Sequence, residues 1–391
     1  MDFSFSEEQT QLRDSLRRYL SQEYTFDARK KIIHGAGTSD TAWAGLAELG
    51  LMGVPVPDPY GGFSGTAVDM LVVMEELGRG LVVEPYFATA VMGAAFIKHG
   101  GSDAHKTALL PKVADGSLKL AAALTEKQSR HELHNVTLTG AASTNGFSLN
   151  GSKTVVLHGA QADKLIVSAR TSGTARDKAG ITVFIVDRSA AGITVRDYRT
   201  IDGMRAADLT FANVSVGKDA VLGKVDEGFA LIERVAQVGV AALCAEAVGC
   251  MAAINEQTIE YLKTRKQFGV VIGKFQALQH RAAEMFMEVE QARSLAYLAS
   301  VKVDSADATE RARAIHAAKV RAGRAIRFVG QAAIQMHGGM GMTDELAVSH
   351  FFKRITMIEA TLGDTDHHLA VFAALGSVQE NATAQAAALT A

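Results

Sequence analysis

The stretch from Tyr261 to Phe286, YLKTRKQFGVVIGKFQALQHRAAEMF, is followed later by QMHGGMGMTDE, from Gln335 to Glu345. In the first segment, one helix ends at the cationic residues Lys263, Arg265 and Lys266. The chain then turns through Phe268-Gly269 and Ile272-Gly273 and begins another helix. The second segment is a helix end that runs into a Gly-Gly turn. Together they predict long helices whose connecting loops carry positive charge, amide side chains and accessible backbone N–H groups.

These loops allow two interpretations. Glycines let a backbone approach a diphosphate closely, and a nearby cation offsets its charge, so the pattern is typical of a phosphate-binding surface. Alternatively, Lys and Arg at a helix C-terminus complement the helix dipole, and the glycines are C-caps. The spacing by itself leaves both interpretations open.

In their order along the chain, the motifs resemble those of the acyl-CoA dehydrogenase family. RKQFGxxIGxFQxxQH begins at Arg265 and QxHGGxG at Gln335, and both follow FSEEQ, VPDPYGGFSG and MEELGR. The chain is most similar to small subunits of heteromeric bacterial enzymes, such as that of pimeloyl-CoA dehydrogenase. The resemblance implies the α+β acyl-CoA dehydrogenase fold, FAD as cofactor, and oxidation of an acyl-CoA thioester to a 2-enoyl-CoA.

Bulk composition narrows the class of protein. A net charge of −2 and a pI near 6.6 favour neither a nucleic acid nor an anionic membrane as partner. Cys244 and Cys250 lie in an apolar helical run and are interpreted as reduced core residues of a cytoplasmic protein. The run from Val235 to Ile254 approaches membrane-spanning length, but it contains Glu246 and predicts an interior helix.

Changes in periodicity predict three domains. Residues 1–118 form a helical domain that begins with a Ser6 to Gln9 capping box, and residues 119–225 form a β domain. Residues 226–391 form a four-helix bundle whose last fifteen or so residues fray. Its buried seam is predicted at Phe275, Leu278, Ala282, Met285, Val289, Ala292 and Ala296, and at Ala318, Ala322, Ala325, Val329 and Ala332.

The β domain is predicted to be small and antiparallel. Its expected strands are 165–168, 181–186, 193–195 and 209–211. Asn145-Gly146 and Asn150-Gly151 are hairpin-type dipeptides and predict turns on both sides of Phe147 to Leu149. Because the chain has no GxGxxG and no βαβ repeat, a nucleotide bound here would not sit on a Rossmann fold.

The resemblance assigns candidate cofactor residues unevenly. Six residues match the family positions that reach a neighbouring subunit's FAD at its diphosphate and adenosine end: Arg265, Phe268, Gln276, Gln335, Gly338 and Gly339. At the flavin end Thr125 is kept, but the Pro of the family motif is Lys127 and its Gly-Ser-Asp is replaced by RHELHN. The family's Trp-Ile-Thr is Val155, Val156 and Leu157, and Leu157 has no hydrogen-bond donor in its side chain.

The catalytic base is unassigned. The family's Glu-Gly-Thr becomes Leu362-Gly363-Asp364, and the alternative Glu-Arg of an earlier helix becomes Gly239-Val240. Asp364 is the one candidate, although Asp364, Asp366, His367 and His368 are explained more simply as a polar turn or helix cap. No metal site is predicted.

These observations lead to one hypothesis and three alternatives. In the hypothesis, the chain is the small subunit of a heteromer, an α2β2 assembly for example. A catalytic large subunit then supplies the base, and an electron-transfer flavoprotein-type acceptor reoxidises the flavin. The alternatives are a self-sufficient homo-oligomer that uses Asp364 or an acid not yet assigned, an oxidase or monooxygenase on this fold, and a purely structural partner. The acyl chain stays open.

Overall fold

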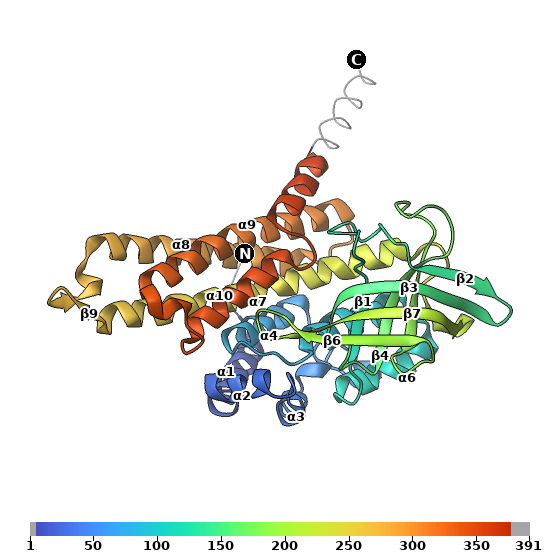
Figure 1. Cartoon of the computed structure of the whole chain (residues 1–391), viewed down its shortest axis with the longest axis horizontal. Helices are drawn as coiled ribbons and strands as arrows, with labels where there is room; N and C mark the ends of the chain where they lie inside the picture. The colour runs from blue at the N-terminus through green and yellow to red at the C-terminus, as the bar shows by residue number, and fades with distance from the viewer. Residues whose placement is uncertain (1–4, 377–391) are drawn as a thin grey trace, which may run out of the picture. The chain divides into compact units, whose positions relative to one another are not determined.

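The computed structural model describes residues 5–376, so the predicted fraying of the last fifteen residues falls outside the described range (Figure 1). Contacts divide the chain into two compact units. One unit contains the residues up to Met70 together with Val82–Gly239, and the other contains Leu71–Leu81 together with the residues from Val240 onward.

The first unit begins with helices. The predicted capping box is confirmed, because the Ser6 hydroxyl accepts from the Gln9 N–H at 3.2 Å and Gln9 Oε1 accepts from the Ser6 N–H at 3.1 Å. The helices are α1 (Glu7–Glu23), α2 (Phe26–His34), α3 (Asp40–Glu48), a π-helical segment (Phe87–Gly93), α5 (Ala94–Gly100) and α6 (Asp103–Ala114). Helix α2 was not predicted from the sequence; it is short, and the hydroxyl of its N-cap Thr25 accepts from the Ala28 N–H.

The strands of this unit form one sheet in the order β6-β7-β3-β2-β4-β5-β8, with β1 beside β4 (Figure 1). They are β1 (Leu120–Ala123), β2 (Thr139–Ser143), β3 (Gly146–Leu157), β4 (Lys164–Arg170), β5 (Ile181–Asp187), β6 (Ile193–Arg199), β7 (Arg205–Gly217) and β8 (Val221–Leu222). Most pairs are antiparallel, as predicted, but β1 and β2 each pair with β4 in parallel. The sheet is therefore mixed.

One predicted turn is wrong. Asn145-Gly146 does lie where β2 ends and β3 begins, but Asn150-Gly151 lies inside the twelve-residue strand β3. The pairing of β3 with β7 shifts register between Leu149 and Gly151, where Gly151 has φ +139°. The glycine therefore serves a β-bulge, and the Asn150 side chain accepts from the Asn213 N–H at 2.8 Å on the neighbouring strand.

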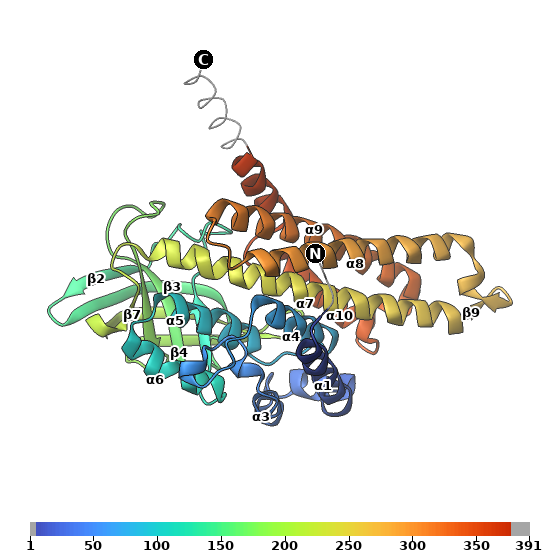
Figure 2. The ribbon, with the colours of Figure 1, turned by 180° about the vertical axis from the view of Figure 1, so that it is seen from behind.

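The second unit is a bundle of long helices (Figure 2). Its helices are α4 (Ala67–Arg79, of which residues 71–79 belong to this unit), α7 (Gly228–Thr264, from Val240), α8 (Gln276–Lys302), α9 (Ala308–His337) and α10 (Ala347–Ala360), followed by helical residues 365–376. By length and composition α7 passes the test for a membrane span, but 89% of its most apolar window is buried, as expected of a core helix.

The predicted seam of the bundle is confirmed in α9 and in most of α8. Met285, Val289, Ala292 and Ala296 are buried, and so are all five predicted α9 positions, whereas Leu278 and Ala282 are half-buried. Phe275 is an exception, because it precedes the first turn of α8 and its side chain is exposed. Helical spacing extrapolated one residue too far places it wrongly in the core.

Candidate functional site

The bundle has a sharp turn between α7 and α8. Strands β9 (Lys266–Gln267) and β10 (Val270–Val271) pair there as a two-residue hairpin. Its central residues, Phe268 and Gly269, have φ +55° and +80°, the signs that a type I′ turn requires. Phe268 is 89% exposed at the tip, and its ring meets Phe275 edge to face at 6.0 Å between centroids.

Two motifs that are distant in sequence meet beside this turn. The ring of Tyr261 in the last turn of α7 stacks on the ring of His337 at the end of α9, with centroids 4.4 Å apart. The Tyr261 hydroxyl also donates to the His337 carbonyl at 3.4 Å. The RKQFG and HGG segments therefore lie at the same end of the bundle, as a shared site requires.

The six candidate residues at this end are open to solvent. The side chains of Arg265, Gln276 and Gln335 are exposed and make no hydrogen bond or ion pair with any residue of the range 5–376. No atom lies within 4 Å of the position that a Cβ would take on Gly338 or Gly339. Unused donors beside an open glycine backbone fit the diphosphate of FAD.

The charge of this bundle end favours an anion. Lys263, Arg265, Lys266 and Lys274 are exposed, and none forms an ion pair within the described chain. A diphosphate would offset this concentration of positive charge. We call the six candidate residues and these lysines the bundle-end cluster.

The β domain contains a different kind of polar group. Glu126 is buried, and its carboxylate accepts from Lys153 Nζ at 2.8 Å, from the Thr137 N–H at 2.9 Å and from the Leu138 N–H at 3.1 Å. The Thr137 hydroxyl and Gln128 Nε2 also donate to it. Burial acts to raise the pKa of Glu126, but Lys153 and the hydrogen bonds lower it to about 2.

A buried arginine completes this internal network. Arg170 donates to the backbone carbonyls of His134 and Ala175, both at 2.9 Å, and of Ala179 at 2.6 Å. It therefore ties residues 127–138, which include the RHELHN segment, to the polar loop that follows β4. The donors of Arg170 are consumed by the fold itself.

The positions that correspond to the family's flavin contacts differ in whether their side chains can still form a hydrogen bond. Val155 lies in a second bulge of β3, with φ +53° and a side chain that is 48% exposed, and its N–H donates to Asp208 Oδ1 at 3.2 Å. A β-branched residue is uncommon at positive φ. Leu157 is half-buried and has no donor, whereas the Thr125 hydroxyl makes no hydrogen bond within residues 5–376. Thr125 is thus the one predicted contact here that is still available.

No base occupies the two family positions. Leu362 has φ +57°, and Asp364 caps the helix that follows, because its Oδ1 accepts from the His367 N–H at 2.8 Å and its carbonyl from the His368 N–H at 3.1 Å. This geometry favours the helix-cap interpretation of Asp364 over the catalytic one. Within the described residues, no group of three or more His, Cys, Asp or Glu side chains is arranged to hold a metal.

A second buried carboxylate, Glu246, forms an ion pair with an arginine that the sequence did not predict as its partner. Glu246 lies in α7, and its two carboxylate oxygens accept from Arg354 of α10 at 2.6 Å and 2.8 Å. A charged residue inside an apolar helix predicts that some buried partner exists. The sequence does not identify that partner, because Glu246 and Arg354 are 108 residues apart. Because both oxygens are engaged, Glu246 is not a free base.

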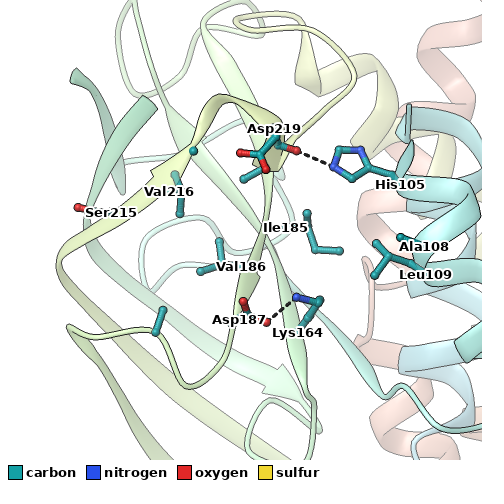
Figure 3. A pocket seen from close by; sticks show the side chains of 13 residues that line it. His105, Ala108, Leu109, Lys164, Ile185, Val186, Asp187, Ser215, Val216 and Asp219 are labelled. Carbon is teal, nitrogen blue, oxygen red and sulfur yellow. Dashed lines mark hydrogen bonds and ion pairs between the residues drawn. The ribbon is translucent and has the colours of Figure 1, made fainter. Parts of the chain in front are cut away.

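One pocket lies apart from these groups in the first unit (Figure 3). It measures about 330 Å³, and His105 Nε2 bonds the Asp219 carbonyl at 2.6 Å on one side, with an ion pair between Lys164 and Asp187 at 2.5 Å on the other. Apolar side chains of α6, β5 and β7, such as Leu109, Ile185 and Val216, form the walls. No candidate cofactor residue lines it.

Comparisons with known proteins identify relatives for the whole chain. Three domain profiles match in order: acyl-CoA dehydrogenase N-terminal domain at residues 6–117, middle domain at 121–214 and C-terminal domain at 226–375. Acyl-CoA dehydrogenase FadE12 of Mycobacterium tuberculosis is 30% identical over 89% of this chain and 91% of its own length.

Solved structures agree with these matches. Butyryl-CoA dehydrogenase from Megasphaera elsdenii superposes with a TM-score of 0.90 at 25% identity, over 97% of this chain and 100% of that one. The Tcur3481-Tcur3483 steroid ACAD gives 0.86 at 28% identity, over 96% and 99%.

Proposed function

Because this chain belongs to the acyl-CoA dehydrogenase family, we propose that it is the small subunit of a heteromeric member and completes the FAD site of a catalytic partner chain. The fold, the oxidoreductase class and the FAD cofactor are those of the family. The proposal concerns which parts of the site this chain supplies.

The contrast in how polar groups are used carries the proposal. Arg265, Gln276 and Gln335 have unused hydrogen-bonding capacity, and they match family positions that reach a neighbour's FAD. Glu126 and Arg170, in the domain that would hold the chain's own flavin, are saturated by internal bonds. This contrast supports the proposal that the chain contacts the FAD bound by its partner and does not bind an FAD of its own.

The bound FAD would accept a hydride from the β-carbon of an acyl-CoA thioester. Arg265 would neutralise diphosphate charge, and the open backbone at Gly338 and Gly339 would let the phosphates approach. Gln276 and Gln335 would donate to the nucleotide end with their free amides. These roles bind and orient the cofactor without any proton transfer by this chain.

The α-proton then needs a carboxylate from elsewhere. Asp364 caps a helix, Glu246 is held by Arg354, and Leu362 and Gly239 have no titratable group. The partner chain would supply the base, in a site shielded from water. An electron-transfer flavoprotein-type protein is proposed as the acceptor, and the cytoplasm as the location.

Flavin stoichiometry tests the proposal. The chain purified alone after incubation with excess FAD should hold close to no flavin by visible absorbance. Co-expressed with a catalytic chain, it should yield about one flavin per pair. One flavin per chain in such a complex would contradict the proposal.

One observation favours a second candidate, the self-sufficient homo-oligomer. The Thr125 hydroxyl, the one flavin-end contact kept from the family motif, is unbonded within the described residues and is therefore available to the chain's own flavin. In that case the chain alone would bind about one FAD and form enoyl-CoA. The base would then be an acid other than Asp364, whose carboxylate serves the cap.

A further inference from the structure

Two histidines of the bundle face each other through the same ring nitrogen. His316 lies on α9 and His368 on the helix 365–376, and their Nδ1 atoms are 2.7 Å apart. The two rings are tilted against each other, with centroids 4.9 Å apart. His368 is buried and His316 is half-buried. Neither residue belongs to the bundle-end cluster or to the flavin-end positions, so the pair needs another explanation.

The contacts of His368 determine where the ring hydrogens lie. Its Nε2 is 3.0 Å from the Leu362 carbonyl, which can only accept, so this nitrogen carries a hydrogen. A neutral His368 then has a bare Nδ1, and the short contact between the rings requires that His316 Nδ1 donates to it. A proton added to His368 Nδ1 would place two N–H groups opposite each other. The contact therefore exists only while His368 is neutral.

The surroundings of the pair disfavour positive charge on either ring. Burial is the largest cause that lowers the pKa of His316 to about 4 and the pKa of His368 to about 2. Repulsion from neighbouring cationic groups acts in the same direction, from His367 on His316 and from Lys319 on His368. Lys319 is itself buried on α9. A protonated pair would thus be destabilised where it stands.

The other charged groups on the adjoining elements are engaged elsewhere. Glu359 of α10 accepts from the Thr365 N–H at 3.1 Å and from Arg327 at 2.9 Å, and Asp364 Oδ1 accepts from the His367 N–H at 2.8 Å. Within residues 5–376, no carboxylate hydrogen-bonds to either ring of the pair. The remaining groups are Arg354, paired with Glu246, Arg313, over the Phe372 ring, Cys244, a buried thiol of α7, and the exposed Asp366.

The backbone before the helix 365–376 has the geometry of a hinge. Lys319 Nζ donates to the carbonyls of Ile358 and Thr361 at 2.5 Å and 2.9 Å and so fixes the end of α10. Directly beyond it, Leu362 and Gly363 have φ +57° and +112°. A Cβ on Gly363 would lie 2.6 Å from His368 Nε2, so the ring packs against the hinge backbone. The His368 ring therefore orients the helix, whereas Lys319 holds what precedes it.

We propose that proton uptake by the His316–His368 pair frees residues 368–376 from α9, so that the docking of this helix depends on pH. The inference does not rest on the proposed function, because it concerns contacts within the bundle of this chain alone. Below the ordinary histidine pKa of about 6.5, the freed state binds more protons than the docked state. Docking is therefore complete above this pH and weakens as the pH falls toward 4.

Hydrogen exchange of residues 368–376 in the full chain tests this proposal. Between pH 7.5 and pH 5, their protection factors, corrected for the intrinsic exchange rate, should fall about 10-fold or more. His316→Asn/His368→Gln removes both titrating rings but keeps side-chain amides that can donate and accept, so its protection should be independent of pH. His280→Asn is the matched control, because His280 is an exposed histidine of α8, and it should leave the pH response unchanged.

The wild type supplies a second measurement that needs no substitution. In an NMR titration, the ring resonances of His368 should change only together with the loss of protection. Titration of this ring near pH 6.5 while the helix stays protected overturns the proposal, and so does unchanged protection at pH 5. Equal loss of protection in the wild type and the double variant would assign the effect to other groups. Simultaneous loss over α8 and α9 would mean acid unfolding of the bundle, and both results also overturn the proposal.

Discussion

The bundle end and the β domain both contain cations and hydrogen-bonding side chains, but they use them in opposite ways. At the bundle end, Arg265 and Gln335 are exposed and unbonded within the described chain. In the β domain, Lys153 is fully buried and donates to Glu126, Ser168 and the Leu124 carbonyl. The first arrangement is ready to bind a ligand, whereas the second stabilises a fold.

The difference teaches how to interpret a family motif whose residues are only partly retained. A residue that matches the family motif can serve either of two purposes: it can bind the cofactor, or it can stabilise the fold. The sequence does not distinguish between them. Glu126 and Lys153 lie in the β domain, where the flavin motif is altered, and their mutual buried ion pair gives both a structural role. At the bundle end, Gly338 does cap α9, but the side chains of Arg265, Gln276 and Gln335 have no such partner within the described chain.

The largest effect should come from breaking the buried pair. Lys153→Met leaves the Glu126 carboxylate buried without its cation, which should lower the free energy of unfolding by about 3–5 kcal/mol. Urea unfolding measures this, and Glu126→Gln/Lys153→Met should recover part of the loss. Wild-type stability in Lys153→Met would mean that the β-domain network is not structural.

Acid should act on the same pair. The pKa of Glu126 is lowered from 4.5 to about 2, so its contribution to stability is complete above pH 4.5 and is lost as the pH falls toward 2. The shift corresponds to roughly 3 kcal/mol. Unfolding of the wild type should therefore become easier between pH 5 and pH 3, and Glu126→Gln should show less of this slope. Equal slopes in the two proteins would contradict the assignment.

Arg265→Ala should change binding and leave folding intact. Removing a charged hydrogen bond to the diphosphate should weaken FAD binding in the assembled enzyme by about 1.5–3 kcal/mol, which raises the Kd roughly 10- to 100-fold. Flavin fluorescence titration measures it. Arg324→Ala is the matched control. Arg324 is also an exposed arginine of the helical bundle, and it forms no ion pair within residues 5–376. Equal FAD affinity in both variants would favour a purely structural partner.

The smallest effect is expected at Asp364. Asparagine caps a helix about as well as aspartate, so Asp364→Asn should change the free energy of unfolding by a few tenths of a kcal/mol. It should also leave enoyl-CoA formation by the complex unchanged, because the carboxylate accepts from the His367 N–H. A loss of activity by orders of magnitude would instead assign the base to this residue.

Local patterns predicted the elements that local interactions decide. The Ser6 capping box and the α9 seam follow from spacings of three and four residues, and both are present. Asn150-Gly151 shows the limit, because the same dipeptide suits a turn or a bulge. Its role depends on the register between β3 and β7, which no short window contains.

The sequence by itself determined the family and the helical bundle, and it predicted the six candidate cofactor residues, because these depend on periodicity and on motif order. Only the tertiary structure decided which polar residues are free. Glu246 finds Arg354 and Glu126 finds Lys153 across long stretches of chain, and Asp364 is engaged by a helix terminus. Whether a side chain binds a ligand or supports the fold depends on partners distant in sequence, and folding alone brings them together.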